Sequence, residues 1–126
     1  MSKTVIYSAT APEPIGPYSQ AILAGSMLFI SGQIAIQKSS GKIISGNITE
    51  ETNQVMINLA EILKAANMDF SHVVKSTIFL KDMNNFPHVN EAYGKNFSSH
   101  PPARETVEVS RLPKDANVEI SCVAIR

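Results

Sequence analysis

The sequence predicts an α+β fold in which two helices cover one face of a mixed sheet of about six strands. Two observations predict it: apolar and β-branched residues gather in six short segments, and only two longer segments show a helical period. The strands are expected at 4–7, 19–24, 27–34, 73–80, 104–111 and 118–125, and the helices at about 47–68 and from 84 or 85 to about 100. At 126 residues the chain has the length of one domain, which we expect to span residues 1–126.

The first three strands are separated by turn-forming residues. Residues 11–17 include three prolines, which exclude regular helix and sheet pairing, so an ordered loop is expected there. Residues 24–26, Ala-Gly-Ser, supply a tight turn, and the strands on either side are expected to form a hairpin. Gly32 interrupts the second of these strands, which indicates either a β-bulge or a place where a ligand approaches the backbone.

Apolar residues at helical spacing mark the two helices. They are Val55, Leu59, Ile62 and Ala66 in the first and Phe86, Val89, Tyr93 and Phe97 in the second. Thr49 is the expected N-cap of the first helix, with two glutamates in the first turn. Asn84 or Asn85 is expected to cap the second, which should end at the prolines 101–102. The last two strands flank a turn at 112–117.

Two helices are too few to cover both faces of such a sheet. Several strands carry apolar residues on both faces, so the second face would expose a large apolar patch. Because patches of that size usually become interfaces, self-association is expected.

The composition excludes several classes of protein. Eleven basic and eleven acidic side chains cancel, so no field of one sign would draw the chain to nucleic acid or to an anionic membrane. We expect a cytoplasmic protein, because no segment resembles a signal peptide or membrane helix and the single cysteine, Cys122, cannot form an intramolecular disulfide. Cys122 lies on the same apolar strand face as Val118 and Ile120, where a cysteine usually fills core space.

The three histidines lie apart, without metal-ligand spacing, so no metal site is expected.

Three polar residues are candidates for chemistry, and each has a structural alternative. Tyr18 follows a stiff Gly-Pro bend and can project its hydroxyl over a pocket, or it can pack at the start of a strand with its tip in water. The Arg104 guanidinium can bind a small carboxylic acid by two parallel hydrogen bonds, or it can form a surface salt bridge. Glu119 points away from the apolar face of its strand, where a carboxylate can act as a general base on water or simply be solvated.

Four segments, taken together and in this order, resemble one known family. They are residues 11–20 (APEPIGPYSQ), 31–34 (SGQI), 73–83 (VVKSTIFLKDM) and 102–113 (PARETVEVSRLP). The chain is similar along almost its whole length to the reactive intermediate deaminase (RidA) family, also described as endoribonuclease L-PSP or translation-inhibitor-like. The resemblance implies a chorismate-mutase-like fold and a homotrimer, in which the sheets form a central barrel and the ligand clefts lie between subunits.

The resemblance also implies roles for particular residues. The arginine matching Arg104 holds the substrate carboxylate, and the residues matching Glu119 and Tyr18 position the hydrolytic water. The other pocket residues that it implies are Ser31, Gly32, Asn90 and Thr106. Many family members have a cysteine where this chain has Thr106, so a thiolate mechanism at that position is excluded.

The activity implied is hydrolysis of reactive enamines and imines, such as 2-iminobutanoate and 2-iminopropanoate, to 2-oxo acids and ammonia. No cofactor is expected, and the link to PLP-dependent dehydratases that produce such imines would be functional, without stable binding. Two alternatives are a single-strand endoribonuclease or translation inhibitor, and a 2-oxo-acid or amino-acid sensor without turnover. The balanced charge and the absence of a histidine pair speak against a nuclease. A sensor would need Arg104 but not Glu119 and Tyr18.

Overall fold

Six strands and two α-helices make up the fold of residues 2–126, which the computed structural model describes. The strands are β1 (Lys3–Ile6), β2 (Ala21–Ala24), β3 (Met27–Gln33), β4 (Val73–Leu80), β5 (Ala103–Glu108) and β6 (Val118–Ile125). The helices are α1 (Ile48–Ala65) and α2 (Phe86–Gly94), with three short 3₁₀ helices, η1 (Phe70–His72), η2 (Met83–Asn85) and η3 (Pro113–Asp115).

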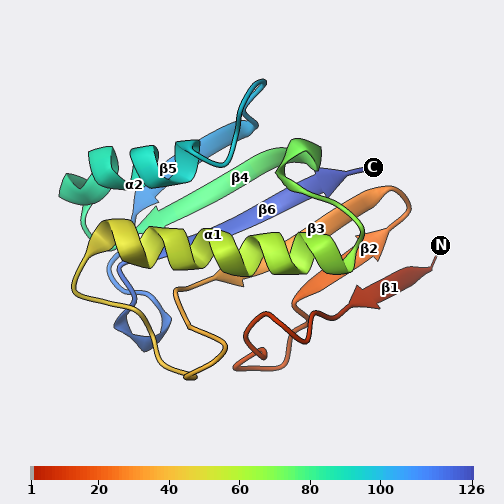
Figure 1. The fold of residues 1–126 in the computed structure, drawn as a ribbon, viewed down its shortest axis with the longest axis horizontal. Helices are drawn as coiled ribbons and strands as arrows, with labels where there is room; N and C mark the ends of the chain where they lie inside the picture. Colours follow the sequence, from red (N-terminus) through yellow and green to blue (C-terminus); the bar gives the residue numbers. More distant parts are fainter. Residues whose placement is uncertain (1) are drawn as a thin grey trace.

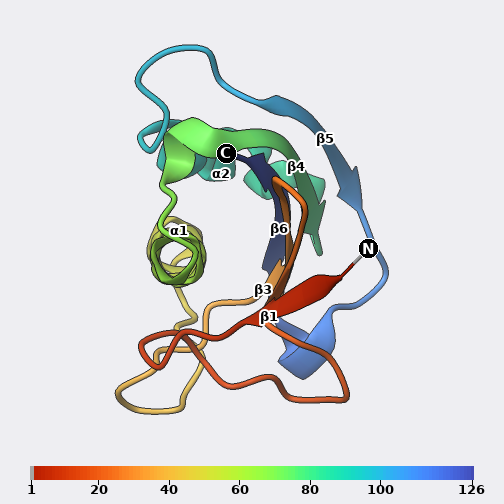
Figure 2. The same cartoon turned by 90° about the vertical axis from the view of Figure 1, so that its right-hand side faces the viewer.

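The six strands pair in one sheet in the order β1-β2-β3-β6-β4-β5. β4 and β5 are parallel, whereas all other neighbours are antiparallel, so the sheet is mixed. Both α-helices lie on the same face of the sheet, as the two perpendicular views show (Figures 1 and 2). The α+β fold predicted from the sequence is confirmed.

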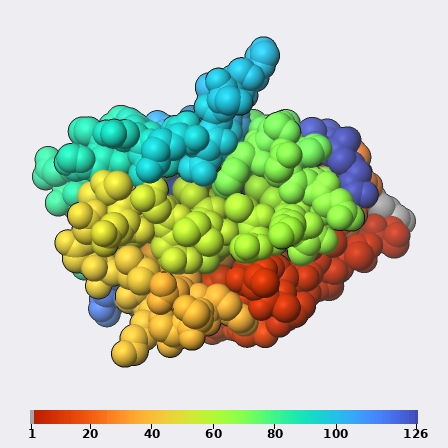
Figure 3. All heavy atoms as spheres, viewed as in Figure 1, coloured from red at the N-terminus to blue at the C-terminus, as the bar shows by residue number. Residues whose placement is uncertain are grey.

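The hydrophobic core lies between this face and the helices. The predicted stripe of α1 is buried, at no more than 2% exposure for Val55, Leu59, Ile62 and Ala66. It packs with side chains of the central strands, including Leu28, Ile78 and Ile120, none of which is exposed. In the space-filling view of this side, α1, α2 and the neighbouring loops close over the sheet (Figure 3).

The ends of α1 differ from the prediction. Asn47, rather than Thr49, is the N-cap: its backbone is extended and its side-chain oxygen accepts a hydrogen bond of 3.1 Å from the backbone N–H of Glu50. Thr49 therefore lies inside the first turn. The helix ends at Ala65 because Asn67 adopts a left-handed conformation, with φ 59°, which stops the helical hydrogen-bond pattern.

The second helix is shorter than predicted. Asn85 occupies the N-cap position without a capping hydrogen bond from its side chain, and Asn84 lies in η2. Pro87 fits the first turn, where a missing N–H costs nothing. Phe97 lies beyond the end of α2, yet its ring still packs against Tyr93, with 4.8 Å between the centroids.

The last two strands flank the predicted turn without pairing with each other. The segment 112–117 contains η3 and carries the chain past β4, which lies between β5 and β6. The chain returns through α2 to the same end of the sheet, so β5 runs parallel to β4, and β5 is the last strand in the sheet order.

Among residues 2–126, no helix lies on the second face of the sheet (Figure 2). Large apolar side chains from four strands are exposed between 38% and 60% on it: Val5, Met27, Phe29, Val107 and Ile125. We call these five side chains the open-face patch. The structure thus contains the uncovered apolar surface that the sequence predicts. Within residues 2–126, no helix is long and apolar enough to cross a membrane.

Candidate functional site

The predicted site residues fall into two groups on opposite faces of the sheet. Arg104 lies beside Ser76 on the neighbouring strand, and Ser76 is buried beneath the helices, so Arg104 also faces the helices. Glu119 lies beside Phe79, which alternates along β4 with residues buried on the helix side and therefore points to the uncovered face. One chain does not bring these two side chains together.

We define the Arg104 cluster as Arg104, Thr106 and Asn90, together with the rings of Phe86 and Tyr93. The guanidinium carbon lies 5.2 Å from the centroid of the Tyr93 ring and 5.6 Å from that of Phe86. Among residues 2–126, no carboxylate lies within 4.0 Å of the guanidinium nitrogens, so the surface salt bridge considered above is not formed.

Two further polar side chains of this cluster come from β5 and α2. Thr106 points to the same side of β5 as Arg104, because it lies two residues further along the strand. Its hydroxyl oxygen is buried and has no hydrogen-bond partner within the described chain. Asn90 is half-buried and lies one turn after Phe86 on α2, so it shares that side of the helix. A buried hydroxyl without a partner is costly unless a ligand or water supplies one.

We define the Glu119 cluster as Tyr18, Ser31, Gly32 and Glu119. Between Ile30 and Gln33, β3 contains one more residue than the facing stretch of β6, so Gly32 lies in a β-bulge, one of the two interpretations given above. A Cβ atom on Gly32 would lie 2.5 Å from Oε2 of Glu119. The carboxylate therefore lies directly over the backbone of Gly32, in space that only glycine leaves free.

The Glu119 carboxylate has no hydrogen-bond or ion-pair partner in the described part of the chain. The side chain is half-buried, and this burial raises the pKa of its carboxyl group. A carboxylate with a raised pKa and without a counterion is a stronger base than a solvated one. Its environment suits proton transfer with a bound water molecule.

A buried glutamine holds together the loop that carries Tyr18. Gln20 is 2% exposed; its side-chain oxygen accepts a hydrogen bond of 2.6 Å from the N–H of Ser8, and its amide donates one of 2.9 Å to the carbonyl of Pro12. Ser31 then joins the loop to the bulge, because its hydroxyl donates to the carbonyl of Ser19 at 2.6 Å. Gln20 was not among the predicted site residues, although it is the last residue of the family-like segment 11–20 and a polar side chain at the start of an apolar strand.

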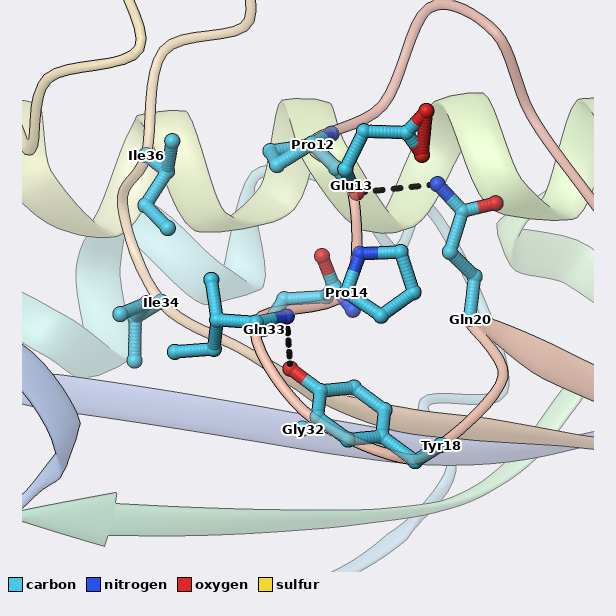
Figure 4. A pocket seen from close by; sticks show the side chains of 10 residues that line it. Pro12, Glu13, Pro14, Tyr18, Gln20, Gly32, Gln33, Ile34 and Ile36 are labelled. Carbon is cyan, nitrogen blue, oxygen red and sulfur yellow. Dashed lines mark hydrogen bonds between the residues drawn. The ribbon is translucent and has the colours of Figure 1, made fainter.

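The Tyr18 hydroxyl points into a small cavity (Figure 4). It accepts a hydrogen bond of 3.2 Å from the backbone N–H of Ile15. The cavity is also lined by Pro12, Pro14 and Gly32, and its volume of about 20 Å³ is enough for one water molecule. On the other side, Tyr18 borders a wider open hollow. The ring is 46% exposed, so Tyr18 remains accessible to a ligand.

The remaining chemistry-bearing residues lie outside both clusters. Cys122 is 3% exposed in the core, and burial raises the pKa of its thiol to about 11, as the predicted core position implies. His72 accepts a hydrogen bond from the backbone N–H of Asp69, and His88 and His100 are exposed. Within residues 2–126, no three His, Cys, Asp or Glu side chains are grouped so that they could hold a metal ion.

Comparison with known proteins assigns the chain to a family. The family model described as Endoribonuclease L-PSP matches residues 8–126. A solved structure of a Rid family protein from Yersinia pestis superimposes with a TM-score of 0.96 at 43% identity, covering 99% of this chain and 100% of that one. The chain belongs to the Rid, or L-PSP, family, and the resemblance inferred from its sequence is confirmed.

Two proteins of this family are similar to the chain along almost its whole length. A RutC family protein from Pyrococcus horikoshii is 51% identical, and the alignment covers 98% of each chain. The human protein named 2-iminobutanoate/2-iminopropanoate deaminase is 49% identical, with coverage of 98% of this chain and 90% of the human one.

Proposed function

We propose that this chain is a 2-iminobutanoate/2-iminopropanoate deaminase, which hydrolyses small 2-imino acids and their enamine tautomers to 2-oxo acids and ammonia. The observation that carries the proposal is the half-buried guanidinium of Arg104, which lies over two rings and has no carboxylate partner in the described chain. Such a group fits a carboxylate ligand. The name of the human relative supports the same substrate class.

We propose that the complete site needs two copies of the chain. Arg104 and Glu119 face opposite sides of one sheet, so they act on one small substrate only if different subunits supply them. The open-face patch gives an apolar surface for such an assembly, and we propose a homotrimer with these faces around a central barrel. Tyr18, Ser31, Gly32 and Glu119 of one subunit then meet Arg104, Thr106 and Asn90 of the next.

In the proposed reaction, Arg104 binds the carboxylate of the imine through two parallel hydrogen bonds. Water, oriented by Tyr18 and Glu119, attacks the imine carbon: a carbon–oxygen bond forms, and the carboxylate of Glu119 takes a proton from the water. Glu119 passes this proton to the imine nitrogen, which gives the carbinolamine. Glu119 then carries the proton of the new hydroxyl group to the amine nitrogen; the carbon–nitrogen bond breaks as the carbonyl forms, and the 2-oxo acid and ammonia leave. We propose that the Thr106 hydroxyl, which has no hydrogen-bond partner within residues 2–126, donates to the substrate.

Residues 1–126 act in this proposal as one cytoplasmic domain. The buried, unpaired Cys122 agrees with a reducing compartment. The imines would come from PLP-dependent dehydratases that release reactive enamines, with no stable complex between the enzymes.

Direct measurement of imine hydrolysis tests the proposal. The imine is generated in the cuvette from an amino acid by an amino-acid oxidase, and its trapping by semicarbazide is followed with and without the protein. We expect less trapped imine and faster release of 2-oxo acid. If the purified protein cleaved single-stranded RNA but left imine trapping unchanged, the deaminase proposal would be wrong and the endoribonuclease alternative would replace it.

Sedimentation tests the assembly separately. A homotrimer is expected at low micromolar concentration. A monomer that retained full activity would contradict the two-copy site, because no single chain brings Arg104 and Glu119 together.

A further inference from the structure

We propose that Phe86 and Tyr93 are positioning residues whose rings form a platform for Arg104 and thereby set the affinity for 2-oxo and 2-imino acids. The inference rests on the proposed function, because it concerns the same carboxylate ligand. The two rings come from α2, so this helix, and not only the strand that bears Arg104, determines where the guanidinium lies.

The two rings are the contacts that hold the guanidinium. Its carbon lies over Tyr93 at 5.2 Å and over Phe86 at 5.6 Å, both within the range of about 6 Å in which a cation is attracted to an aromatic face. In the described chain, Arg104 donates no side-chain hydrogen bond and joins no ion pair. Because the guanidinium donates no hydrogen bond within residues 2–126, its N–H groups remain available for a carboxylate.

The Tyr93 ring is itself held by side chains of the core. It is 5% exposed, and its hydroxyl donates a hydrogen bond of 2.9 Å to Oγ of Ser76, which is fully buried. Ser76 in turn lies 3.5 Å from the sulfur of Cys122. Phe97 packs against the side of the Tyr93 ring, with 4.8 Å between centroids. These contacts support the ring on two sides, and an arginine with a preorganised platform loses less entropy when it binds a ligand.

Phe86→Leu is the most informative variant, and Phe70→Leu is its matched control. Both phenylalanines are partly buried and pack against the same core, but Phe86 contacts Arg104 directly, whereas Phe70 packs edge-to-face on Phe97, with 5.4 Å between centroids, and reaches the platform only through that ring. We expect Phe86→Leu to weaken 2-oxobutanoate binding, measured by calorimetry, about five-fold, the effect of losing one partly desolvated cation–π contact. Phe70→Leu should lose stability to a similar degree and keep the wild-type Kd.

Tyr93 allows a test by conservative replacement. Tyr93→Phe keeps the ring and should bind within about two-fold of wild type, because the hydroxyl contributes to stability rather than to the cation contact. Tyr93→Leu removes the ring and should weaken binding at least as much as Phe86→Leu. Equal binding by Tyr93→Leu and wild type would overturn the platform.

A measurement without ligand separates this inference from the proposed function. The order parameter of the Arg104 Nε–H bond, from ¹⁵N relaxation, should fall in Phe86→Leu and remain unchanged in Phe70→Leu. An unchanged value in Phe86→Leu overturns the platform, whatever the protein binds. A fall in a protein that binds no 2-oxobutanoate supports the platform and overturns the proposed substrate instead.

Discussion

The Arg104 cluster and the Glu119 cluster differ in how the fold keeps a charged group without a counterion. Arg104 lies on an edge strand and is held by aromatic faces, which attract a cation without using its N–H groups. Glu119 lies on a central strand, over a glycine in a bulge, where burial raises the pKa of its carboxyl group. The first arrangement preserves hydrogen-bond donors for a ligand anion, whereas the second makes a carboxylate more basic. In the proposed reaction, this difference suits the Arg104 cluster to binding and the Glu119 cluster to proton transfer.

The largest effect should come from removing the base. Glu119→Gln nearly preserves shape, so kcat should fall about 100-fold or more while the Kd for 2-oxobutanoate stays close to that of the wild type. Steady-state imine hydrolysis and calorimetric titration measure the two quantities. Wild-type turnover in this variant would show that the Glu119 cluster does not perform proton transfer.

The same variant gives a pH signature. The carboxyl pKa is raised from 4.5 by burial, so the ionised base should be lost as pH falls through a value above 4.5, and the acidic limb of the kcat profile should disappear in Glu119→Gln.

The raised pKa of Glu119 also changes how the free energy of unfolding depends on pH, in the direction opposite to that of a salt-bridged carboxylate. A raised folded-state pKa favours the folded protein at low pH, and this contribution is lost as pH rises through that pKa. Glu119→Gln should therefore melt higher than wild type at pH 7.5, with a smaller difference at pH 4.

Removing the cation should affect binding instead. Arg104→Ala loses a bidentate, charge-assisted pair that contributes roughly 1.5–3 kcal/mol, so kcat/KM should fall ten- to a hundred-fold or more. Arg104→Lys should restore little, because an ammonium lacks the planar fork. Arg111→Ala is the matched control, since Arg111 is exposed and pairs with Asp115 at 2.8 Å outside both clusters. Wild-type affinity of Arg104→Ala for 2-oxobutanoate would contradict the assignment.

The contrast between the clusters also marks the limit of the sequence analysis. The period-2 alternation correctly indicated that Glu119 faces away from the core and that Thr106 shares the side of Arg104. It did not reveal that Arg104 and Glu119 lie on opposite faces. That relation depends on the register of β5 and β6 against β4, which comes between them. Phe86 and Tyr93 were assigned correctly to the apolar stripe of α2, but their contact with Arg104 joins segments that no local pattern connects.

Hydrophobic periodicity predicted the helices and strands themselves. Where a helix begins or ends was predicted less accurately, because neighbouring residues carry competing signals. All six strands and both helices were predicted from their hydrophobic periods. Thr49 and Asn47 are both good N-caps, and the extended backbone at Asn47 decides between them. Phe97 fits the helical period of α2 although it lies outside the helix, because it packs on the same core.

A smaller, indirect effect tests the glycine beneath Glu119. Gly32→Ala places a methyl group where Oε2 of Glu119 now lies, 2.5 Å from the new carbon, so the carboxylate must move. Because a displaced base is misaligned rather than absent, kcat should fall about ten-fold, less than in Glu119→Gln. Gly94→Ala is the control, since the Cβ it would add meets no atom within 4 Å apart from its chain neighbours and the backbone of its own helix. Full turnover in Gly32→Ala would show that the position of Glu119 over the bulge is not required.

The smallest effect is expected at Cys122, the nucleophilic side chain that lies in neither cluster. Its thiol is buried in the core beside Ser76, and burial raises its pKa to about 11, so the reactive thiolate is scarce at neutral pH. Cys122→Ser should keep turnover per folded chain within about two-fold of wild type and cost about 1 kcal/mol of stability. Iodoacetamide at pH 7.5 should leave the native enzyme active, and the same treatment in denaturant should alkylate the cysteine completely. If a folded Cys122→Ser protein lost turnover, the nucleophile would be the Cys122 thiol rather than a water molecule activated by Glu119. Binding by the Arg104 cluster and proton transfer by the Glu119 cluster would then no longer explain the reaction.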